Sequence, residues 1–430
     1  MGKKLVGAAL IVAGSLCLLG GPAKANAQGN TWAGENLARM VEDAALRWGL
    51  LRVNAAFTLA RAGYDSDIYY GYLAEPTPDW TLSAGVPVQV LVPLGKKVVL
   101  ELFDEPQYLF YLETEKERAW NNTFQGRIHF ALDRVYLQAG GAMADVRRRF
   151  SPELDINVRE KRDGLNGLAL WQAAKAASFA VVYEWARFDY GDAEYMGLTI
   201  SERLNREEQH LDLVAYVQPS AKVRLFADGR YGMYTFTADL ANLRDARSYG
   251  LFGGAELMTP GEEMGIRGGL RLGFTRLDVE DPLREDGSGF AGEGDISVDL
   301  TRKLSVRAFF SKGYQFSVYS GSSFYLSTTF GAGLSQRLSR KTAFSYSVSF
   351  GSRSYPEDAD VQDLRDRYTT HAFSLNVRLA RNLDVSLLGT LGRRKLDVSG
   401  TYLDRNFFGL NLTYGFSRGS FSSPADGLRP

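Results

Sequence analysis

Long stretches of the chain alternate between apolar and polar side chains. From 341 to 353, the even positions carry threonine, phenylalanine, tyrosine, valine and phenylalanine, while serine, alanine, glycine and arginine occupy the odd positions. The stretches 265–274 and 371–379 alternate in the same way. A period of two residues is typical of a β-strand with one apolar face and one polar face. We therefore expect an all-β fold.

The alternating stretches are separated by two kinds of polar segment. Short turns such as LTRKL, LSRKT and LARNL recur from near residue 95 to near residue 381, about every 40 residues. Between successive short turns, a longer polar loop joins two alternating runs. This repeat is typical of a transmembrane antiparallel β-barrel with short periplasmic turns and longer extracellular loops. A propeller blade would need four short strands per repeat, and these runs are too long for that.

The number of alternating runs predicts the size of the barrel. We count eighteen strands between residues 50 and 416, an even number that leaves both chain ends on the periplasmic side. Sixteen is the alternative, because Pro87 and Pro106 fall inside the second and third runs, where each lacks a ladder N–H. A barrel of 16–18 strands encloses an aqueous channel rather than a packed core.

Residues 1–27 have the features of a secretory signal peptide. Lys3 and Lys4 precede an apolar run that ends at the small-residue site Ala25-Asn26-Ala27. A retained membrane anchor is the alternative, but the apolar run is short for one. The only cysteine, Cys17, lies inside this leader, so the remainder has no disulfide framework. We expect a periplasmic segment over 28–48, a barrel over 49–416 and a flexible tail over 417–430.

Composition narrows the class of protein further. Without the three leader lysines, 47 basic residues stand against 50 acidic ones, a net charge of −3, which argues against nucleic-acid binding. After the leader, no run approaches the roughly 20 apolar residues of a spanning helix. An exported chain rich in glycine and aromatic residues is then either a soluble β protein or an outer-membrane barrel, and the long-range repeat favours the barrel.

The alternation also predicts which charged side chains line the channel. Facing lipid, each would cost up to about 2–4 kcal/mol at the bilayer midplane, so we expect them to face inward. The lumen candidates are Arg224, Asp228, Arg230, Arg267, Arg271, Asp295, Asp299, Arg307, Arg337 and Arg378. Their mixed sign indicates either a hydrated wall whose charges neutralise each other or a track for a polar, weakly charged solute.

Aromatic residues fall on both predicted faces. Tyr216, Tyr234 and Tyr325 have inward parity, where they would either stack on sugar rings or pack beneath infolded loops. Residues expected in the interfacial girdles are Trp185, Tyr314, Phe324, Tyr355 and Tyr402. All predicted loops are shorter than about 20 residues, and none stands out as a constriction loop. The sequence therefore favours a wide lumen.

Both ends of the barrel carry a recognisable pattern. Leu37, Met40, Val41, Ala44 and Trp48 recur at helical spacing before the first strand. This amphipathic helix would plug the lumen, brace the rim or contact a periplasmic partner, and bracing is our expectation. The last strand, FFGLNLTYGF, resembles the terminal aromatic signal that the barrel-assembly machinery reads.

No constellation of catalytic or metal-binding residues is evident. The chain has only His129, His210 and His371, and it lacks a G-x-S-x-G elbow and an H-E-x-x-H helix. Asp212 would lie near His210 on one face, but no nucleophile accompanies the pair. There is no phosphate-binding glycine loop. We expect a protein without cofactor or metal that is not an enzyme.

From about residue 290 to 416, the chain resembles the β-barrel porin-2 proteins that accompany exopolysaccharide gene clusters. The resemblance rests on the L-[ST]-R-K-L turns, the strands in which serine and glycine alternate with apolar residues, and a loop of the form R-x-Y followed by aspartate and arginine. It implies an outer-membrane channel that passes an exopolysaccharide outward. The implied partner is a periplasmic polysaccharide-export protein of a flippase/polymerase-dependent pathway. The family pattern assigns no binding residues.

Two classes of function remain open at this point. The first is polysaccharide export through a wide barrel, which the resemblance and the short loops favour. The second is passive diffusion or sugar uptake, which needs no partner protein. An adhesion barrel is a third and weaker alternative.

Overall fold

A computed structural model describes the chain over residues 33–70, 75–149, 151, 153, 156–195, 197–237, 243–257, 265–319, 322–356, 365–396 and 402–415. The signal peptide predicted at 1–27 and the tail predicted at 417–430 lie outside these residues. The helices are α1 (Ala33–Glu42), the 3₁₀ helix η1 (Glu115–Glu117) and α2 (Ile200–Leu204).

The strands are β1 (Leu46–Trp48), β2 (Leu51–Asp65), β3 (Asp79–Gly85), β4 (Val88–Pro93), β5 (Val98–Asp104), β6 (Gln107–Tyr111), β7 (Ala119–Ala131), β8 (Val135–Arg148), β9 (Val158–Ala174), β10 (Ala177–Tyr190), β11 (Glu194–Tyr195), β12 (Leu198–Thr199), β13 (Arg206–Ser220), β14 (Val223–Phe236), β15 (Ala246–Leu257), β16 (Ile266–Val279), β17 (Gly287–Asp299), β18 (Leu304–Phe316), β19 (Phe324–Arg337), β20 (Thr342–Ser354), β21 (Arg365–Ala380), β22 (Leu383–Leu396) and β23 (Tyr402–Gly415).

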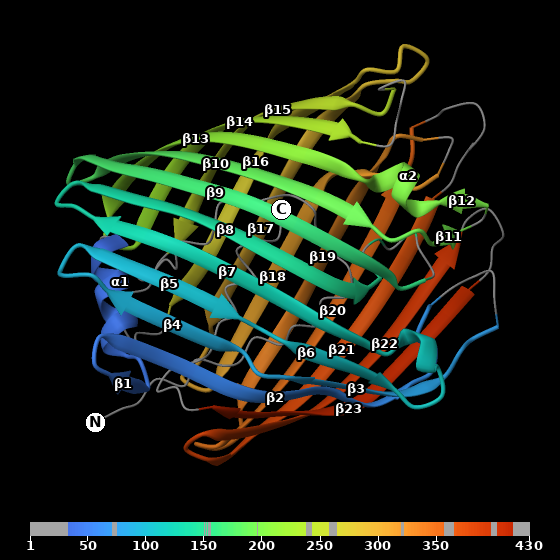
Figure 1. Ribbon diagram of the computed structural model, residues 1–430, viewed down its shortest axis with the longest axis horizontal. Coiled ribbons are helices and arrows are strands. Elements are labelled where there is room, and N and C mark those ends of the chain that lie inside the picture. Colours follow the sequence, from blue (N-terminus) through green and yellow to red (C-terminus); the bar gives the residue numbers. More distant parts are fainter. Residues whose placement is uncertain are drawn as a thin grey trace.

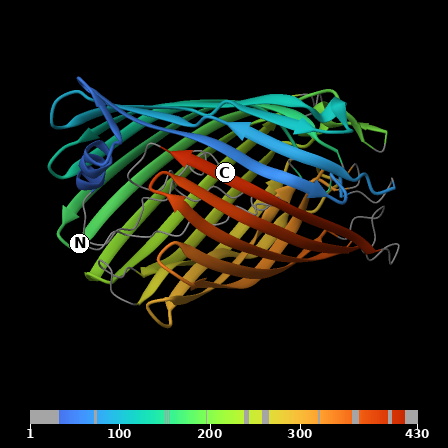
Figure 2. The same ribbon diagram turned by 90° about the horizontal axis from the view of Figure 1, so that it is seen from below.

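The strands form one closed antiparallel barrel of 18 staves, which confirms the predicted fold. Each stave pairs with the next along the chain, and β2 closes the barrel by pairing with β23, with Phe57 opposite Tyr414. Figure 2 shows this blue-to-red seam. Closure joins the first and last staves, as a membrane-spanning sheet requires, and the upper parts of β17 and β18 are left unpaired with each other.

Two prolines interrupt the second and third staves without ending them. The second stave consists of β3 and β4 with Pro87 between them, and the third consists of β5 and β6 with Pro106 between them. Proline has no N–H to donate, but its carbonyl still accepts. The N–H of Ala56 donates to Pro87 O and the N–H of Val86 donates to Pro106 O, both at 3.1 Å. The alternative of sixteen strands is therefore wrong.

The repeated L-[ST]-R-K turns have a local physical cause. Thr301 Oγ1 accepts the N–H groups of Lys303 and Leu304 at 3.1 and 3.0 Å. Ser339 Oγ accepts those of Lys341 and Thr342 at 3.1 and 3.0 Å. The hydroxyl oxygen thus accepts the backbone N–H groups that have no strand partner where the chain reverses direction. The motif belongs to the short turns and explains why they are uniform.

The two ends of the barrel differ. Short turns and α1 lie at one end, while the longer connections, including α2 and the β11–β12 hairpin, lie at the other (Figure 1). In single-chain barrels the short-turn end is periplasmic and the long-loop end extracellular. We refer to them as the inner and outer ends.

The N-terminal segment lies inside the inner end of the barrel. Helix α1 stops at Glu42, earlier than the helical spacing to Trp48 predicts, because Ala45 N–H donates to Asn54 Oδ1 at 3.0 Å and the chain turns into β1. Leu37 packs on the inward side chains of Leu91 and Val99. The helix therefore rests against the interior wall.

Among the described residues, no helix is long and apolar enough to cross a membrane.

Candidate channel lumen and its outer closure

Alternate side chains of each stave face the interior or the membrane. The interior face is identified by contacts between strands that are not neighbours in the barrel: the rings of Tyr234 in β14 and Phe316 in β18 have centroids 4.8 Å apart. The opposite face exposes large apolar side chains, including Phe274, Phe330 and Phe350. In a bilayer that face contacts lipid.

The strand register places every residue predicted to line the lumen on the interior face. On β13 and β14 these are Tyr216, Arg224, Asp228, Arg230 and Tyr234; on β16–β18 they are Arg267, Arg271, Asp295, Asp299 and Arg307; on β19 and β21 they are Tyr325, Arg337 and Arg378. Their surroundings differ along the barrel, and they form more than one kind of surface.

The interior face of β13–β18 is dense in charge, and we call it the charged wall. Its members are Arg206, Glu208, Asp212, Arg224, Asp228, Arg230, Glu256, Arg267, Arg271, Glu293, Asp295, Asp299 and Arg307. Arginine Nε or Nη atoms lie 2.8 Å from Glu256 and Asp299 and 2.9 Å from Asp295. Opposite charges thus neutralise each other across neighbouring strands.

Asp228 is the most buried member of the charged wall. Its side chain is inaccessible to solvent, and Arg230 Nε donates to Asp228 Oδ2 at 3.0 Å. Arg271, two staves away, donates to the same oxygen. Arg230 also lies 3.4 Å from Asp212. One carboxylate therefore holds two guanidinium groups from β14 and β16, where their mutual repulsion would otherwise separate the strands.

The two remaining charged candidates lie at the inner end. Arg378 Nε donates to Asp384 Oδ1 across β21 and β22 at 3.0 Å. The side chain of Arg337 makes no ion pair within the described part of the chain, and its backbone N–H donates to Lys303 O at 2.7 Å. These residues form the inner rim rather than the charged wall.

The three inward tyrosines have separate environments. The guanidinium of Arg224 lies 4.9 Å from the ring centre of Tyr216. Tyr234 packs against Phe316, and its hydroxyl lies 3.3 Å from Ser248 Oγ. Tyr325 is buried and donates to Gln315 Oε1 at 2.6 Å. Tyr234 and Tyr325 are covered by protein, which agrees with the alternative of packing beneath infolded segments.

The interior face of β19–β22 has a different chemistry, and we call its middle part the hydroxyl wall. It consists of Ser327, Thr329, Gly331, Gly333, Ser335, Ser345, Ser347, Ser349, Gly351, Thr370, Ala372, Ser374, Asn376, Ser386, Leu388 and Thr390, of which Leu388 is the one large apolar side chain. Its hydrogen bonds are neutral: Ser345 Oγ lies 3.2 Å from Ser335 Oγ, and Ser386 Oγ lies 2.6 Å from Asn376 Oδ1. The serines of β20 are partly exposed, whereas Thr329, Ala372 and Ser374 are almost fully buried.

The outer end is closed by the tip of one hairpin. This β18–β19 tip, residues 313–319 and 322–325, bends into the barrel. Val318 is buried among Val158, Phe188, Ile200 and Leu204, which belong to β9, β10 and α2. Strands β18 and β19 are the thirteenth and fourteenth staves, whereas β9 and β10 are the sixth and seventh. The tip therefore crosses the lumen.

A buried carboxylate holds the tip in place. Glu153, from the β8–β9 connection, has no solvent-exposed surface. It accepts hydrogen bonds from Ser317 Oγ at 2.8 Å, Val318 N–H at 2.8 Å and Tyr355 Oη at 2.7 Å. Burial raises the pKa of Glu153 more than these bonds and nearby Arg353 lower it. The β8–β9 connection thus meets two neighbouring connections, β18–β19 and β20–β21, at this group.

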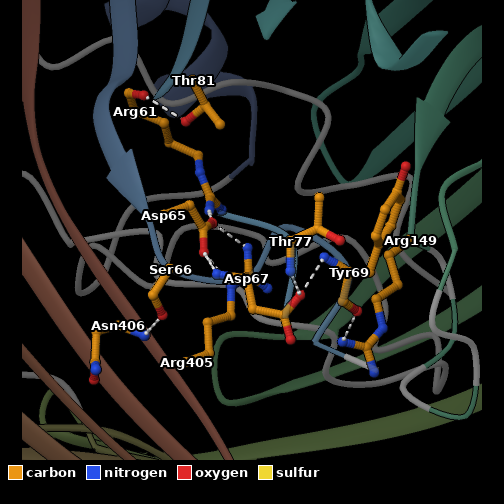
Figure 3. A network of polar contacts seen from close by, with 10 residues as sticks. All are labelled: Arg61, Asp65, Ser66, Asp67, Tyr69, Thr77, Thr81, Arg149, Arg405 and Asn406. Atoms are coloured by element: carbon orange, nitrogen blue, oxygen red, sulfur yellow. Dashed lines mark hydrogen bonds and ion pairs between the residues drawn. The ribbon is translucent and has the colours of Figure 1, made fainter. Parts of the chain in front are cut away.

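Other paired charges stabilise the outer rim. Asp366 Oδ2 accepts from Arg353 at 2.7 Å and from Arg394 at 2.6 Å, and all three side chains are buried. At the β2–β23 seam, Asp65 accepts from Arg61 at 3.3 Å and from Arg405 at 2.9 Å (Figure 3). These pairs join staves that meet at the outer rim.

The chain after β2 is fixed to the same rim. Asp67 Oδ1 accepts the N–H groups of Tyr69 and Thr77 at 3.2 and 3.4 Å, and Arg149 donates to Tyr69 O at 3.1 Å (Figure 3). Arg149 follows β8, so this bond reaches from the first connection to the β8–β9 connection. The outer closure is therefore a network and not a single contact.

A cavity lies beneath the tip, between the charged wall and the infolded strands. Glu184, Glu208, His210 and Tyr234 line one side of it, and Phe316 lines the other. The infolded tip narrows the lumen at its outer end in the described conformation.

The infolded tip corrects two sequence-based expectations. Tyr314, Phe324 and Tyr355 were predicted in the interfacial girdle, but Tyr314 and Phe324 pack on the interior wall and Tyr355 contacts Glu153. The absence of a long loop predicted a wide lumen, and this is also wrong, because the ends of two strands supply the constriction. Tyr402, in contrast, is exposed on the outer face.

The histidines have structural partners. His129 contacts Glu101 at 3.1 Å and Tyr136 Oη at 2.8 Å, and His210 contacts Glu208 at 3.3 Å rather than Asp212. The part of the chain that the structure describes contains no group of three side chains placed to hold a metal ion.

Sequence reasoning missed two groups of residues at this site. The hydroxyl wall is visible in the sequence as the serine-rich odd positions of 341–353. Small uncharged side chains cost little free energy on either face of a strand, so the alternation alone does not assign them to the lumen. Glu153 lies in a connection without periodicity, so alternation could not identify it. Only its burial and its three hydrogen-bond donors show its importance.

Comparison with solved structures finds distant likenesses of overall fold. Acinetobacter baumannii OccAB4 shares 10% identity at a TM-score of 0.49, covering 84% of this chain and 97% of that chain. Pseudomonas aeruginosa OpdL shares 13% at 0.48, covering 84% and 99%. A bacterial polysaccharide outer membrane secretin shares 9% at 0.37, covering 84% and 97%. Similarities this distant say nothing about solute or mechanism.

No curated protein sequence matches the chain. The family model described as "Putative beta-barrel porin 2" matches residues 110–416, well over half of the chain. Porins are channel-forming barrels of the bacterial outer membrane, in agreement with the closed 18-stave barrel. The chain belongs to this family, Putative beta-barrel porin 2.

Proposed function

We propose that the protein is the outer-membrane channel through which an exopolysaccharide leaves the cell. The observation that carries this proposal is the hydroxyl wall. Ser345, Ser347 and Ser349 follow one another along the interior face of β20, next to Thr370 and Ser374 of β21. The three serines are partly exposed, so each offers a weak hydrogen bond that a passing sugar hydroxyl can exchange for the next one, whereas Ser374 is buried. Such a surface suits movement of a polyol chain better than tight binding.

The closed outer end supports a regulated channel. A diffusion porin must stay open to work, whereas an export channel that stayed open would leak periplasmic solutes between rounds of secretion. The tip and Glu153 close the described conformation from inside the barrel. Opening it only while polymer is delivered requires a signal from the inner end.

We propose that a periplasmic polysaccharide-export protein supplies polymer and that signal. The interior position of α1 at the inner end supports such a contact, since a partner entering there meets the exposed face of the helix, including Ala38, Arg39 and Met40. We propose the outer-membrane lipids and the barrel-assembly machinery as its other partners, because a barrel of this kind must be inserted into that membrane.

The test is an in-frame deletion in the native host, with a complemented strain as control. We expect polymer to disappear from the cell surface and to accumulate in the periplasm, with the other export proteins at normal levels. Unchanged surface polymer in the deletion strain would sink the export role.

A second candidate function is passive diffusion or uptake of small sugars, which the cavity beneath the tip favours. Its lining combines carboxylates with the rings of Tyr234 and Phe316, groups that bind sugar hydroxyls and sugar faces. Single-channel recordings distinguish the two functions. Uptake predicts steady conductance that short oligosaccharides block, while export predicts a mostly closed channel.

A further inference from the structure

Strand pairing between β17 and β18 stops partway up the barrel. The last pair is Gly292 with Lys312, and the pairs continue downward to Asp299 with Ser305. Above that point, β17 still pairs with β16 as far as Gly287, and β18 still pairs with β19 as far as Phe316. The barrel wall therefore has a gap in strand pairing between β17 and β18, although each of these strands remains paired with its other neighbour.

Above the division, the hairpin passes inside the wall. A Cβ atom added to Gly287 would lie 3.0 Å from the ring of Phe324 and 3.1 Å from that of Tyr314. A Cβ atom added to Gly289 would lie 3.5 Å from Tyr314 Oη. Both glycines face inward, so these rings cover the interior surface of β17. Glycine leaves the space that they occupy.

The alternation of the sequence fits a different arrangement. Phe310, Tyr314 and Phe316 share one parity in β18, and in the paired part of the strand that parity faces lipid. Continued upward in the same register, Phe290 would pair with Tyr314 and Gly289 with Gln315. No insertion would be needed, and the aromatic rings would face the outer membrane interface, where such rings are favoured.

We propose that the β18–β19 tip has two states: the infolded, closed state of the structure, and an open state in which β18 completes its pairing with β17. Opening withdraws Val318 from its apolar site and frees Glu153. It replaces these contacts with strand hydrogen bonds, which a barrel wall otherwise lacks over Gly287–Ala291. Two packings of one segment that differ by little free energy make a switch.

This inference concerns how the proposed channel is regulated, but the switch itself holds for any solute. Glu153 determines the balance, because the closed state alone gives its carboxylate three donors. Lys312 and the adjacent Gly313 lie at the division, where the strand bends inward. The tip would move as a unit about that point.

The direct test is Phe290→Cys with Tyr314→Cys, in a Cys17→Ser background, studied in planar lipid bilayers. In the closed state residue 290 faces outward, 49% exposed, while Tyr314 covers the interior of β17, so no disulfide can form. In the open state they would be opposite each other, near disulfide range. We expect oxidation to raise conductance several-fold and reduction to reverse it, with no response from either single cysteine.

A folded double-cysteine barrel that never forms the disulfide, or that forms it without a change in conductance, would overturn the two-state proposal. Glu153→Ala provides a second measure that needs no crosslink. We expect it to raise the open fraction several-fold, while Glu115→Ala, which removes an exposed carboxylate on η1, leaves it unchanged. Equal open fractions would remove Glu153 from the mechanism. Surface polymer in cells reports the export role separately.

Discussion

The charged wall and the hydroxyl wall are built from the same kind of strand, but their interior faces differ. Both expose apolar side chains to lipid with a period of two. On β13–β18 the inward side chains are long, paired and partly buried, whereas on β19–β22 they are short and joined by neutral hydrogen bonds. Charge-assisted hydrogen bonds are roughly twice as strong as neutral ones.

This difference separates two tasks within one barrel. The charged wall fills its own space and holds its strands together, so it contributes stability and leaves little free charge. The hydroxyl wall contributes little per residue, and the serines of β20 stay partly exposed, so that strand suits passage of a solute. The β18–β19 tip lies at the boundary between them, and a movement there changes how much of the hydroxyl wall is accessible.

The largest difference between the walls is expected in stability. Asp228→Ala would leave Arg230 and Arg271 buried without their shared carboxylate, at a cost of about 3–5 kcal/mol in the free energy of unfolding. Ser374→Ala, which removes a buried hydroxyl from the hydroxyl wall, should cost about 1 kcal/mol. Urea unfolding in lipid vesicles measures both. Equal losses would contradict the division of tasks.

Substitutions at two adjacent residues of β20 test which face of this strand points into the lumen. Val348→Arg places a charge in lipid near the middle of β20 and should destabilise the barrel by about 2–4 kcal/mol. Ser347→Arg places the same charge in the lumen and should leave stability nearly unchanged. The fraction of folded barrel in heat-modifiability gels reports both variants. The reverse result would mean that the strand register is inverted.

A smaller effect is expected from pH at the boundary between the walls. Burial raises the pKa of Glu153 in the closed state, and an exposed carboxyl has the ordinary lower value. The closed state therefore binds a proton more readily, so it gains stability as the pH falls and loses it as the pH rises through the raised pKa. The charged and titratable groups facing Glu153 are Arg353, Tyr355 and Tyr325.

We expect conductance to fall reversibly on acidification and Glu153→Gln to abolish most of that response. Arginine and tyrosine do not titrate in the acidic range, so they leave the prediction unchanged. An equal pH response in wild type and Glu153→Gln would assign the effect to another group.

The barrel could be predicted from the sequence because alternation is a local property that every stave repeats. The same parity placed Arg271 and Asp295 on the interior face, since a charge in lipid is costly at any position. Even the interruptions at Pro87 and Pro106 follow from a local rule, the missing N–H. The facing of the strands thus required no knowledge of distant contacts, whereas the choice between sixteen and eighteen strands needed the pairing observed at these two prolines.

The outer closure could not be predicted in this way. Alternation shows that Tyr314 and Phe324 have the same parity as the lipid-facing residues of their strands. It does not show whether the end of this hairpin continues along the barrel wall or folds into the lumen. That depends on Val318 meeting residues of β9 and α2, and on Glu153 accepting hydrogen bonds from Ser317 and Val318, which are far away in the chain. Loop length was therefore a poor guide to the width of the lumen.

The export proposal requires polymer to pass along the hydroxyl wall. A photo-crosslinking amino acid at position 347, introduced in cells that secrete polymer, tests it most directly, with position 348 on the lipid face of the same strand as control. We predict that illumination attaches carbohydrate to the barrel at 347 and not at 348. Normal surface polymer with no carbohydrate attached at 347 would contradict the account.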